Sequence, residues 1–199
     1  MPKPVLYYVR HGLTEWNMQQ RLQGRHDVPL IPQGRSQALR CGEILRDLLA
    51  RDGRVPGDLV YVSSPLVRAR ETMELVRATL SLPAAGYEVD ARLAEIAFGD
   101  WEGLTYEDVI KRDGDVVTKR ENDKWGFLPP GGESYAQVTA RVGAWYDALE
   151  RDAVVTAHGG TARALLAHLS IHERDAATHQ PIDQGVVYVY AGNRLARYA

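Results

Sequence analysis

The sequence has one cysteine, no long apolar run and no marked excess of charge of either sign. Cys41 is the single cysteine in 199 residues, which excludes an intrachain disulfide. The 24 Lys and Arg residues and the 26 Asp and Glu residues give a formal net charge of −2. General binding to nucleic acid or to an acidic membrane surface needs an excess of positive charge. We therefore expect neither nucleic acid nor a membrane as a partner.

Membrane-spanning and secretory segments are not predicted either. No apolar run reaches the ~20 residues that span a bilayer, and Met1-Pro2-Lys3-Pro4 leads directly into a strand pattern without an apolar leader. Hydrophobic residues make up 45% and charged residues 25%, a balance typical of globular domains. A chain of this length buries a substantial core without disulfides or structural metal. We expect a single domain over residues 1–199, located in the cytoplasm.

Strand patterns alternate with helical patterns along most of the chain. β-branched and aromatic runs predict strands, and apolar positions at helical spacing predict helices between them. This alternation predicts an α/β fold, a three-layer α/β/α sandwich around a mostly parallel sheet, with a terminal hairpin as an antiparallel edge. Residues 104–130 show a weaker pattern, which we interpret as an inserted cap or lid. The predicted strands are 5–9, 59–62, 87–89, 153–157, 185–190 and 194–198, and the predicted helices are 36–50, 66–80, 133–152 and 161–169.

Three of the predicted strands end in polar residues. Arg10 and His11 follow the first, Ser64 with Arg68 follows the second, and His158 follows a later one. In open α/β sheets, ligands bind beyond the carboxyl ends of the strands. Both histidines precede a glycine, and this recurrence is difficult to explain by packing alone. The sequence therefore predicts a site at this edge of the sheet.

The residue types at these strand ends suit phosphoryl transfer. That reaction spreads negative charge over three oxygens, so positioned cations stabilise it, and an arginine fork can hold two of those oxygens. A neutral imidazole is a competent nucleophile, and a carboxylic acid can protonate the leaving group. We expect the glycine after each histidine to let the backbone approach the phosphoryl group with its N–H exposed.

Five motif blocks in one order resemble the histidine phosphatase superfamily, also called the phosphoglycerate mutase-like family. Arg10-His11-Gly12-Leu13-Thr14 matches the R-H-G-x-T signature, and Asn17, Gln23-Gly24 and Asp27-x-Pro29-Leu30 follow in the order of the family. The other blocks are Ser64 to Thr72, Leu93 to Gly103, Gly131-Gly132-Glu133-Ser134 and His158-Gly159-Gly160. The resemblance covers nearly the whole chain and implies the phosphoglycerate mutase-like fold.

The resemblance also implies a role for each matching residue. His11 corresponds to the phosphorylated nucleophile, and Glu95 to the proton donor that later activates water. The residues that would hold the phosphate are Arg10, Thr14, Asn17, Arg68, His158 and the Gly159 N–H, and Gln23 and Gly24 would line the substrate pocket. No metal and no other cofactor are implied, because the arginines and His158 supply the positive charge. Ala157 departs from the serine or threonine common before the second histidine.

Several residues carry an alternative interpretation. Glu102 is a rival for the acid, although the family pattern favours Glu95. Arg163 suits a salt bridge on a helix face better than a ligand role. His168 and His172 have the i, i+4 spacing of a metal pair but no nearby third ligand. The run from Trp125 to Pro130 is a candidate pocket wall.

Three functions remain open at this point. The favoured one is a phosphomonoester phosphatase acting on a small-molecule phosphate ester, because Phe98-Gly99-Asp100-Trp101-Glu102-Gly103 resembles phosphatase branches of the family, the α-ribazole phosphatases among them. The second is a phosphoglycerate mutase-type transferase, disfavoured because such mutases look longer than 199 residues. The third is a non-catalytic phosphate-binding or interaction module. The substrate and the oligomeric state stay open, with a dimer among the alternatives.

Overall fold

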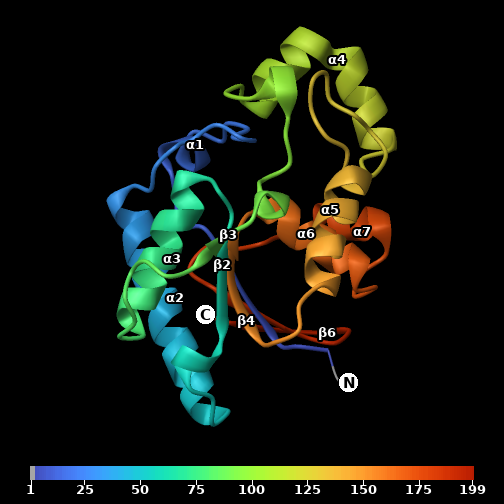
Figure 1. The fold of residues 1–199 in the computed structure, drawn as a ribbon. Coiled ribbons are helices and arrows are strands. Elements are labelled where there is room, and N and C mark those ends of the chain that lie inside the picture. Colours follow the sequence, from blue (N-terminus) through green and yellow to red (C-terminus); the bar gives the residue numbers. More distant parts are fainter. Residues whose placement is uncertain (1–2) are drawn as a thin grey trace.

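The structure is a computed structural model that describes residues 3–199 (Figure 1). Met1 and Pro2, which belong to the prediction that no leader precedes the first strand, lie outside these residues. The strands are β1 (Leu6–Arg10), β2 (Val60–Ser63), β3 (Glu88–Val89), β4 (Ala153–Ala157), β5 (Val187–Ala191) and β6 (Arg194–Tyr198). The α-helices are α1 (Glu15–Met18), α2 (Pro32–Arg51), α3 (Val67–Thr79), α4 (Tyr106–Asn122), α5 (Tyr135–Asp147), α6 (Gly159–His168) and α7 (Arg174–His179), and short 3-10 turns are η1 (Pro56–Asp58), η2 (Ala91–Leu93) and η3 (Gly99–Trp101).

The six strands form one sheet in the order β3-β2-β4-β1-β5-β6. The four strands from β3 to β1 run parallel, while β5 is antiparallel to β1 and β6 to β5. Helices α2 and α3 lie on one face of the sheet, and α5, α6 and α7 lie on the other (Figure 1). The predicted three-layer α/β architecture with an antiparallel edge is therefore confirmed.

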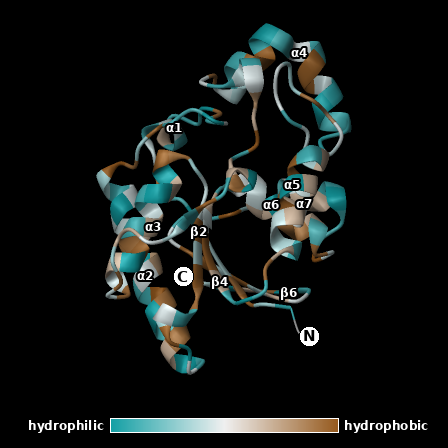
Figure 2. Ribbon diagram, viewed as in Figure 1, coloured by the Kyte–Doolittle hydropathy of each residue, from teal (hydrophilic) through white to brown (hydrophobic). Residues whose placement is uncertain are grey.

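Two apolar clusters form the core, one on each face of the sheet. In β1, Tyr7 and Val9 pack toward α2 and α3, whereas Leu6 and Tyr8 pack toward α5 and α6. All four side chains are fully buried because side chains alternate between the faces of a strand and this sheet is covered on both. Figure 2 shows the same pattern, with hydrophobic strands in the centre and hydrophilic residues on the outer sides of the helices.

Helix boundaries differ from the sequence prediction at positions with particular cap chemistry. Helix α2 begins at Pro32, because proline is favoured in the first turn of a helix and fixes a suitable φ. Helix α5 begins after Ser134, whose hydroxyl accepts the Gln137 N–H in a capping box, and it ends at Asp147. Helix α7 was not predicted, since its six residues are too few for a periodic apolar pattern.

The segment 104–130 contains helix α4, which lies beyond the carboxyl ends of the parallel strands (Figure 1). Thr105 caps α4 through a reciprocal pair with Asp108. A small apolar cluster around Trp101 fastens α4 to the rest of the chain, and Trp101 stacks on Phe127 with ring centroids 5.6 Å apart. Trp125 instead packs against the apolar cluster that lies between the sheet and helices α5 and α6. In the part of the chain that is described, no helix has both the length and the apolar character to cross a membrane.

Candidate active site

The central position of β4 brings the polar residues of three strands together. β4 lies between β2 and β1, and all three are parallel, so their carboxyl ends meet at the same edge of the sheet. The backbone pairing continues one residue past the strands: the His11 N–H donates to the Ala157 carbonyl at 2.9 Å, and the Ser64 N–H donates to the Thr156 carbonyl at 3.0 Å. His11, Ser64 and His158 therefore stand side by side, as the strand ends predicted.

A hydrogen bond selects the tautomer of His11. Its Nδ1 lies 2.8 Å from the Gly12 carbonyl oxygen, which can only accept, so Nδ1 carries the proton. Nε2 is then left with a free electron pair. The His11 ring lies 5.2 Å from the ring of His158, centroid to centroid, and the two planes are tilted by 57°.

Both histidines are neutral at pH 7. Burial, reinforced by the charges of Arg68 and Arg10, lowers the pKa of His11 well below its usual range. Burial also lowers the pKa of His158, with Arg68, His11 and Arg10 acting in the same direction. The neutral form of imidazole is the nucleophilic one.

Two arginines lie beside the histidines with part of their donor capacity unused. Arg10 donates from one terminal nitrogen to the Ile182 carbonyl, and Arg68 donates to the carbonyls of Gly24 and His26. The Nε of each arginine is buried and has no hydrogen-bond partner among residues 3–199. Burial lowers the pKa of Arg68 to about 10, which leaves it charged at neutral pH. Buried, charged and unpaired N–H donors are what an anion such as a phosphoryl group requires.

Hydrogen bonds hold both the backbone and the imidazole ring of His158. The Tyr8 hydroxyl donates to its carbonyl oxygen at 2.6 Å and accepts from its N–H at 3.0 Å. The ring nitrogen Nε2 lies 2.7 Å from the Ser64 hydroxyl. The other ring nitrogen, Nδ1, is buried and finds no partner in the described part of the chain. Tyr8 and Ser64 thus fix the backbone and the ring of His158.

Glu95 lies at the N-terminus of α6. Its Oε2 accepts the Gly160 N–H at 3.2 Å, and its Oε1 accepts the N–H of Ile96 at 2.9 Å. The first N–H groups of a helix have no partner within it and favour a negative charge. Glu95 therefore occupies the helix end that begins just after His158.

The rival carboxylate, Glu102, is engaged elsewhere. Its Oε1 accepts the N–H groups of Arg25 and Phe98, and its Oε2 lies 3.6 Å from His26 Nε2. Gly24 packs directly on this carboxylate, and its positive φ of 50° suits glycine. Glu102 thus joins the Gly24 loop, which supports Arg68, to the segment after Glu95. These contacts make Glu102 a structural link between the two segments.

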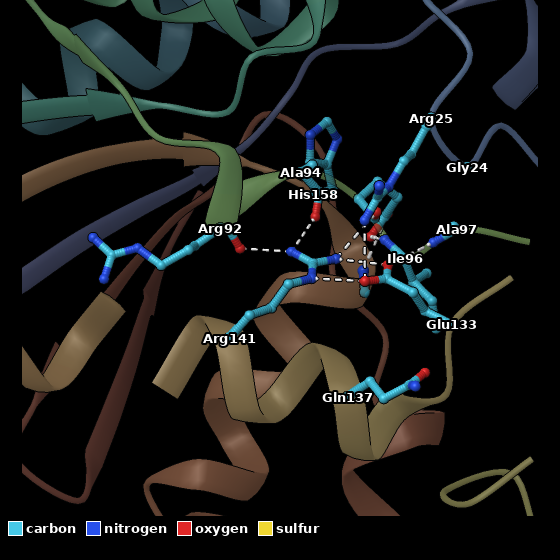
Figure 3. A network of polar contacts seen from close by, with 12 residues as sticks. Gly24, Arg25, Arg92, Ala94, Ile96, Ala97, Glu133, Gln137, Arg141 and His158 are labelled. Atoms are coloured by element: carbon cyan, nitrogen blue, oxygen red, sulfur yellow. Dashed lines mark hydrogen bonds and ion pairs between the residues drawn. The ribbon is translucent and has the colours of Figure 1, made fainter. Parts of the chain in front are cut away.

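A partly buried ion pair between Arg141 and Glu133 positions the Glu95 segment (Figure 3). Arg141 donates to both carboxylate oxygens of Glu133 at 3.0 Å and to the carbonyls of Arg92, Ala94 and Glu95. Burial alone raises the pKa of Glu133, but hydrogen bonds from Arg141 and from the Ala97 N–H outweigh it and leave the pKa below its usual range. The pair therefore holds the backbone on both sides of Glu95.

The remaining predicted site residues form a polar cluster beside His11. The Thr14 hydroxyl hydrogen bonds to Asn17 Oδ1 at 3.0 Å and to Gln23 Oε1 at 3.0 Å. Gln184, which the sequence did not single out, donates from Nε2 to the His11 carbonyl and to Asn17 Oδ1. With its oxygen held, Asn17 has its amide nitrogen left as a donor. Gln23 contacts the Thr14 hydroxyl, and Thr14 in turn orients the Asn17 side chain.

The role expected for Gly12 was wrong. Its N–H donates to the Thr72 hydroxyl at 3.1 Å and is not available to a phosphoryl group. A Cβ on Gly12 would lie only 2.7 Å from the carbonyl carbon of Gly34. Glycine is needed here because two backbone segments, the loop after β1 and the start of α2, touch each other.

Arg163 and His168, both on α6, contact residues of neighbouring segments. The salt bridge expected for Arg163 is not formed with any of residues 3–199; its Nε donates to the Gln180 carbonyl at 2.8 Å instead. The metal pair of His168 and His172 gains no third ligand, since no group of three potential metal-binding side chains gathers in the described chain. His168 Nε2 lies 3.2 Å from Asp147 Oδ2.

Sequence reasoning missed several residues that support the site. Ser64 was named only as a strand end and Thr72 only as part of a motif block, although the block from Ser64 to Thr72 could have pointed to both hydroxyls. Arg141 and Gln184 carry no such signal, because their partners are 46 and 173 residues away in the chain. Tyr8 was classed only as part of a strand.

Comparison with known proteins agrees with this geometry. A sequence profile described as the histidine phosphatase superfamily (branch 1) matches residues 6–194. The chain belongs to the histidine phosphatase superfamily. That assignment confirms the resemblance drawn from the five motif blocks, and the superfamily contains both phosphatases and mutases.

Its relatives within the superfamily carry names of both kinds. A 2,3-bisphosphoglycerate-dependent phosphoglycerate mutase of Afipia carboxidovorans is 31% identical, with 96% of this chain and 92% of that protein covered. An uncharacterized phosphatase, PhoE, of Bacillus subtilis is 33% identical, with coverages of 81% and 75%. The crystal structure of the α-ribazole phosphatase of Shigella flexneri superposes with a TM-score of 0.74 at 25% identity, covering 93% of this chain and 89% of that one.

Proposed function

We propose that this histidine phosphatase superfamily member hydrolyses phosphomonoesters of small metabolites through a phosphohistidine at His11. The observation that carries the proposal is the state of His11: neutral, with Nδ1–H on the Gly12 carbonyl and Nε2 free, beside two arginines with unpaired Nε–H donors. A neutral imidazole nucleophile beside N–H groups that can bind the phosphoryl oxygens is suited to attack on phosphorus.

The reaction follows in two steps. Nε2 of His11 attacks phosphorus, the ester P–O bond breaks, and the leaving alkoxide takes a proton from Glu95. The Glu95 carboxylate then takes a proton from water, whose oxygen attacks phosphorus; the P–N bond breaks, inorganic phosphate leaves and His11 is neutral again. Arg10, Arg68 and His158 stabilise the charge on the phosphoryl oxygens in both steps, and no metal is needed to supply positive charge.

A phosphoglycerate mutase activity is the second candidate, because a relative that covers 96% of the chain carries that name. The length argument against a mutase does not hold, since this chain covers 92% of that relative. The preference for hydrolysis rests on the segment from Phe98 to Gly103, which resembles phosphatases, and on relatives named as phosphatases. With 3-phosphoglycerate, a phosphatase releases inorganic phosphate, whereas formation of 2-phosphoglycerate without phosphate release would establish the mutase.

The phosphohistidine has its own test. Incubation with a phosphate donor, followed by an alkaline quench and mass spectrometry, should place an acid-labile phosphate on the peptide that contains His11. His11→Ala should abolish both this label and turnover. A label that survives the substitution would refute the assignment of the nucleophile, and a wild-type protein that binds phosphate with neither label nor turnover would establish a non-catalytic module.

A further inference from the structure

The hydroxyl of Ser64 has two hydrogen-bonding neighbours among residues 3–199, and they restrict where its proton can lie. Ser64 is fully buried just after β2. The Leu66 N–H donates to its Oγ at 3.3 Å, and Nε2 of His158 lies 2.7 Å from the same oxygen. An N–H can only donate, so the Leu66 contact occupies an electron pair of Oγ. Nε2 of His158 is therefore the acceptor that remains there for the Ser64 proton.

The two tautomers of a neutral His158 differ in how many buried groups they leave unpaired in the described part of the chain. With the proton on Nε2, the Ser64 hydroxyl has no acceptor and the electron pair of Nδ1 has no donor. With the proton on Nδ1, Ser64 donates to Nε2, and only the Nδ1–H is left without a partner. Unpaired polar groups are unfavourable in a buried place, so these contacts favour the Nδ1–H tautomer. Burial, followed by the charge of Arg68, lowers the pKa of His158 and disfavours the doubly protonated ring.

The unpaired Nδ1–H of His158 matches two other unpaired donors beside His11. Arg10 Nε and Arg68 Nε are also buried without a partner among the residues that the structure describes. The charges of both arginines act on His158 and on His11, whose rings lie 5.2 Å apart between centroids. In the Nδ1–H tautomer all three unpaired atoms are N–H donors, as anionic phosphoryl oxygens require. In the other tautomer, an electron pair of His158 would replace one of these donors and repel the oxygens.

We propose that Ser64 is a positioning residue, whose hydroxyl holds His158 in the Nδ1–H tautomer so that the ring offers the phosphoryl group an N–H and not an electron pair. The inference rests on the proposed function, in which the phosphoryl group lies at His11, and it deepens the role of His158. Ser64 acts on the phosphoryl group through His158, because its one proton is given to Nε2.

Nuclear magnetic resonance of protein labelled with ¹⁵N-histidine tests the tautomer without turnover. Protonated and unprotonated ring nitrogens have well-separated ¹⁵N shifts, and the signals of His158 are those that His158→Ala removes from the spectrum of the six histidines. At pH 7 we expect Nδ1 of His158 to carry the proton and Nε2 to carry none. In Ser64→Ala, we expect most molecules to carry the proton on Nε2. A wild-type ring with a proton on Nε2, or an unchanged tautomer in Ser64→Ala, would overturn the inference.

Hydrolysis of p-nitrophenyl phosphate measures the consequence for activity. We expect Ser64→Ala to lower kcat/KM about fivefold, the loss that follows when about a fifth of the molecules keep the Nδ1–H form. Ser63→Ala is the matched control, because the Ser63 hydroxyl is equally buried but contacts the Ser64 carbonyl and Thr156. Its kcat/KM should stay within about twofold of wild type, since the competent fraction is unchanged. An equal loss in both variants would overturn the inference.

A double-mutant cycle separates an action through His158 from a general loss of structure. In a His158→Ala background the Ser64 hydroxyl has no ring to orient, so Ser64→Ala should then change kcat/KM by less than about twofold. A loss in this background as large as in the wild-type background would show that Ser64 acts by another route, and the inference would be wrong.

The proposed function and this inference can fail separately. Loss of p-nitrophenyl phosphate hydrolysis in His11→Ala reports on the proposed function alone, because it does not depend on the tautomer of His158. If the wild-type protein hydrolyses the ester while His158 has the other tautomer, the phosphatase stands and the role of Ser64 is wrong. If the wild-type protein does not hydrolyse the ester, the proposed function fails, and the ring signals alone decide whether Ser64 sets the tautomer.

Discussion

Gly160→Ala is expected to impair catalysis by moving Glu95, with little effect on folding. A Cβ at position 160 would lie 2.7 Å from Ile96 Cγ2 and 3.2 Å from Glu95 Cδ, with Glu95 Oε1 closer still. Carbon atoms pack at about 3.5–4.0 Å, so the carboxylate must withdraw by roughly 1 Å. A displacement of this size at a reacting group can lower the rate about 100-fold.

Folding should be nearly unaffected by the same substitution. The carboxylate is the far end of a flexible side chain and can turn away, whereas Ile96 is buried and branched at Cβ. The shift of its Cγ2 offsets the gain of about 1 kcal/mol by which a helix favours alanine over glycine. We therefore expect kcat for p-nitrophenyl phosphate to fall about 100-fold, with a change of about 1 kcal/mol or less in the free energy of unfolding. Steady-state kinetics and urea unfolding measure the two effects.

A double-mutant cycle connects the loss to Glu95. In a Glu95→Ala background the added methyl group has no carboxylate to displace, so Gly160→Ala should then change kcat by less than threefold. Gly114→Ala is the matched control, since a Cβ at position 114 meets nothing within 4 Å. A Gly160→Ala enzyme that keeps kcat within threefold of wild type would refute the placement of the acid at Glu95.

Two further outcomes are expected. Arg141→Met removes five hydrogen bonds and leaves Glu133, with 18% of its side chain exposed, the Arg25 guanidinium and the Ala97 N–H as remaining partners, so thermal and urea unfolding should show a loss of about 2 kcal/mol. Arg112→Met, in an exposed pair, should stay within about 0.5 kcal/mol. An unchanged stability in Arg141→Met would show that the ion pair does not hold the Glu95 segment. The protein should also lose stability as pH falls below 6.5. The pKa values of His11 and His158 are lowered in the folded state, so between pH 6.5 and 5.5 only the unfolded chain takes up protons at these two side chains. We expect each histidine to lower the free energy of unfolding by about 1 kcal/mol over this range. Urea unfolding at both pH values measures this, and a stability that rises on acidification would contradict the neutral state of both rings.

The motif residues were predictable because their chemistry is encoded locally. A strand that ends in Arg10 and His11, and another that ends in His158, can be read from a few consecutive residues, and parallel strands place such ends on one edge. Five blocks in one order then indicated the family. The capped start of α5 at Ser134 is similarly local, although the predicted helix began two residues too early and extended beyond Asp147.

Other parts of the site depend on contacts between distant segments. The role given to Gly12 was wrong because nothing in the R-H-G motif reveals that Gly34 packs against it. Arg163 was expected to form a salt bridge, yet the fold turns it toward Gly159 and Tyr135. Gly159 is its i−4 neighbour on α6, but Tyr135 lies 28 residues away in the chain, so the second contact is set by the fold.

The sequence by itself determined the strands, the helices α2, α3, α5 and α6, the three-layer fold and the residues that meet at the ends of β1, β2 and β4, because apolar periodicity and strand polarity are local properties. Only the tertiary structure decided that Glu95 lies at the start of α6, that Arg141 and Glu133 hold its backbone, and that the charges of Arg120 and Arg163 act on Lys124. The physical reason is that hydrogen bonds and charges act through space, and folding alone brings segments as far apart in the chain as 46 and 65 residues within their reach.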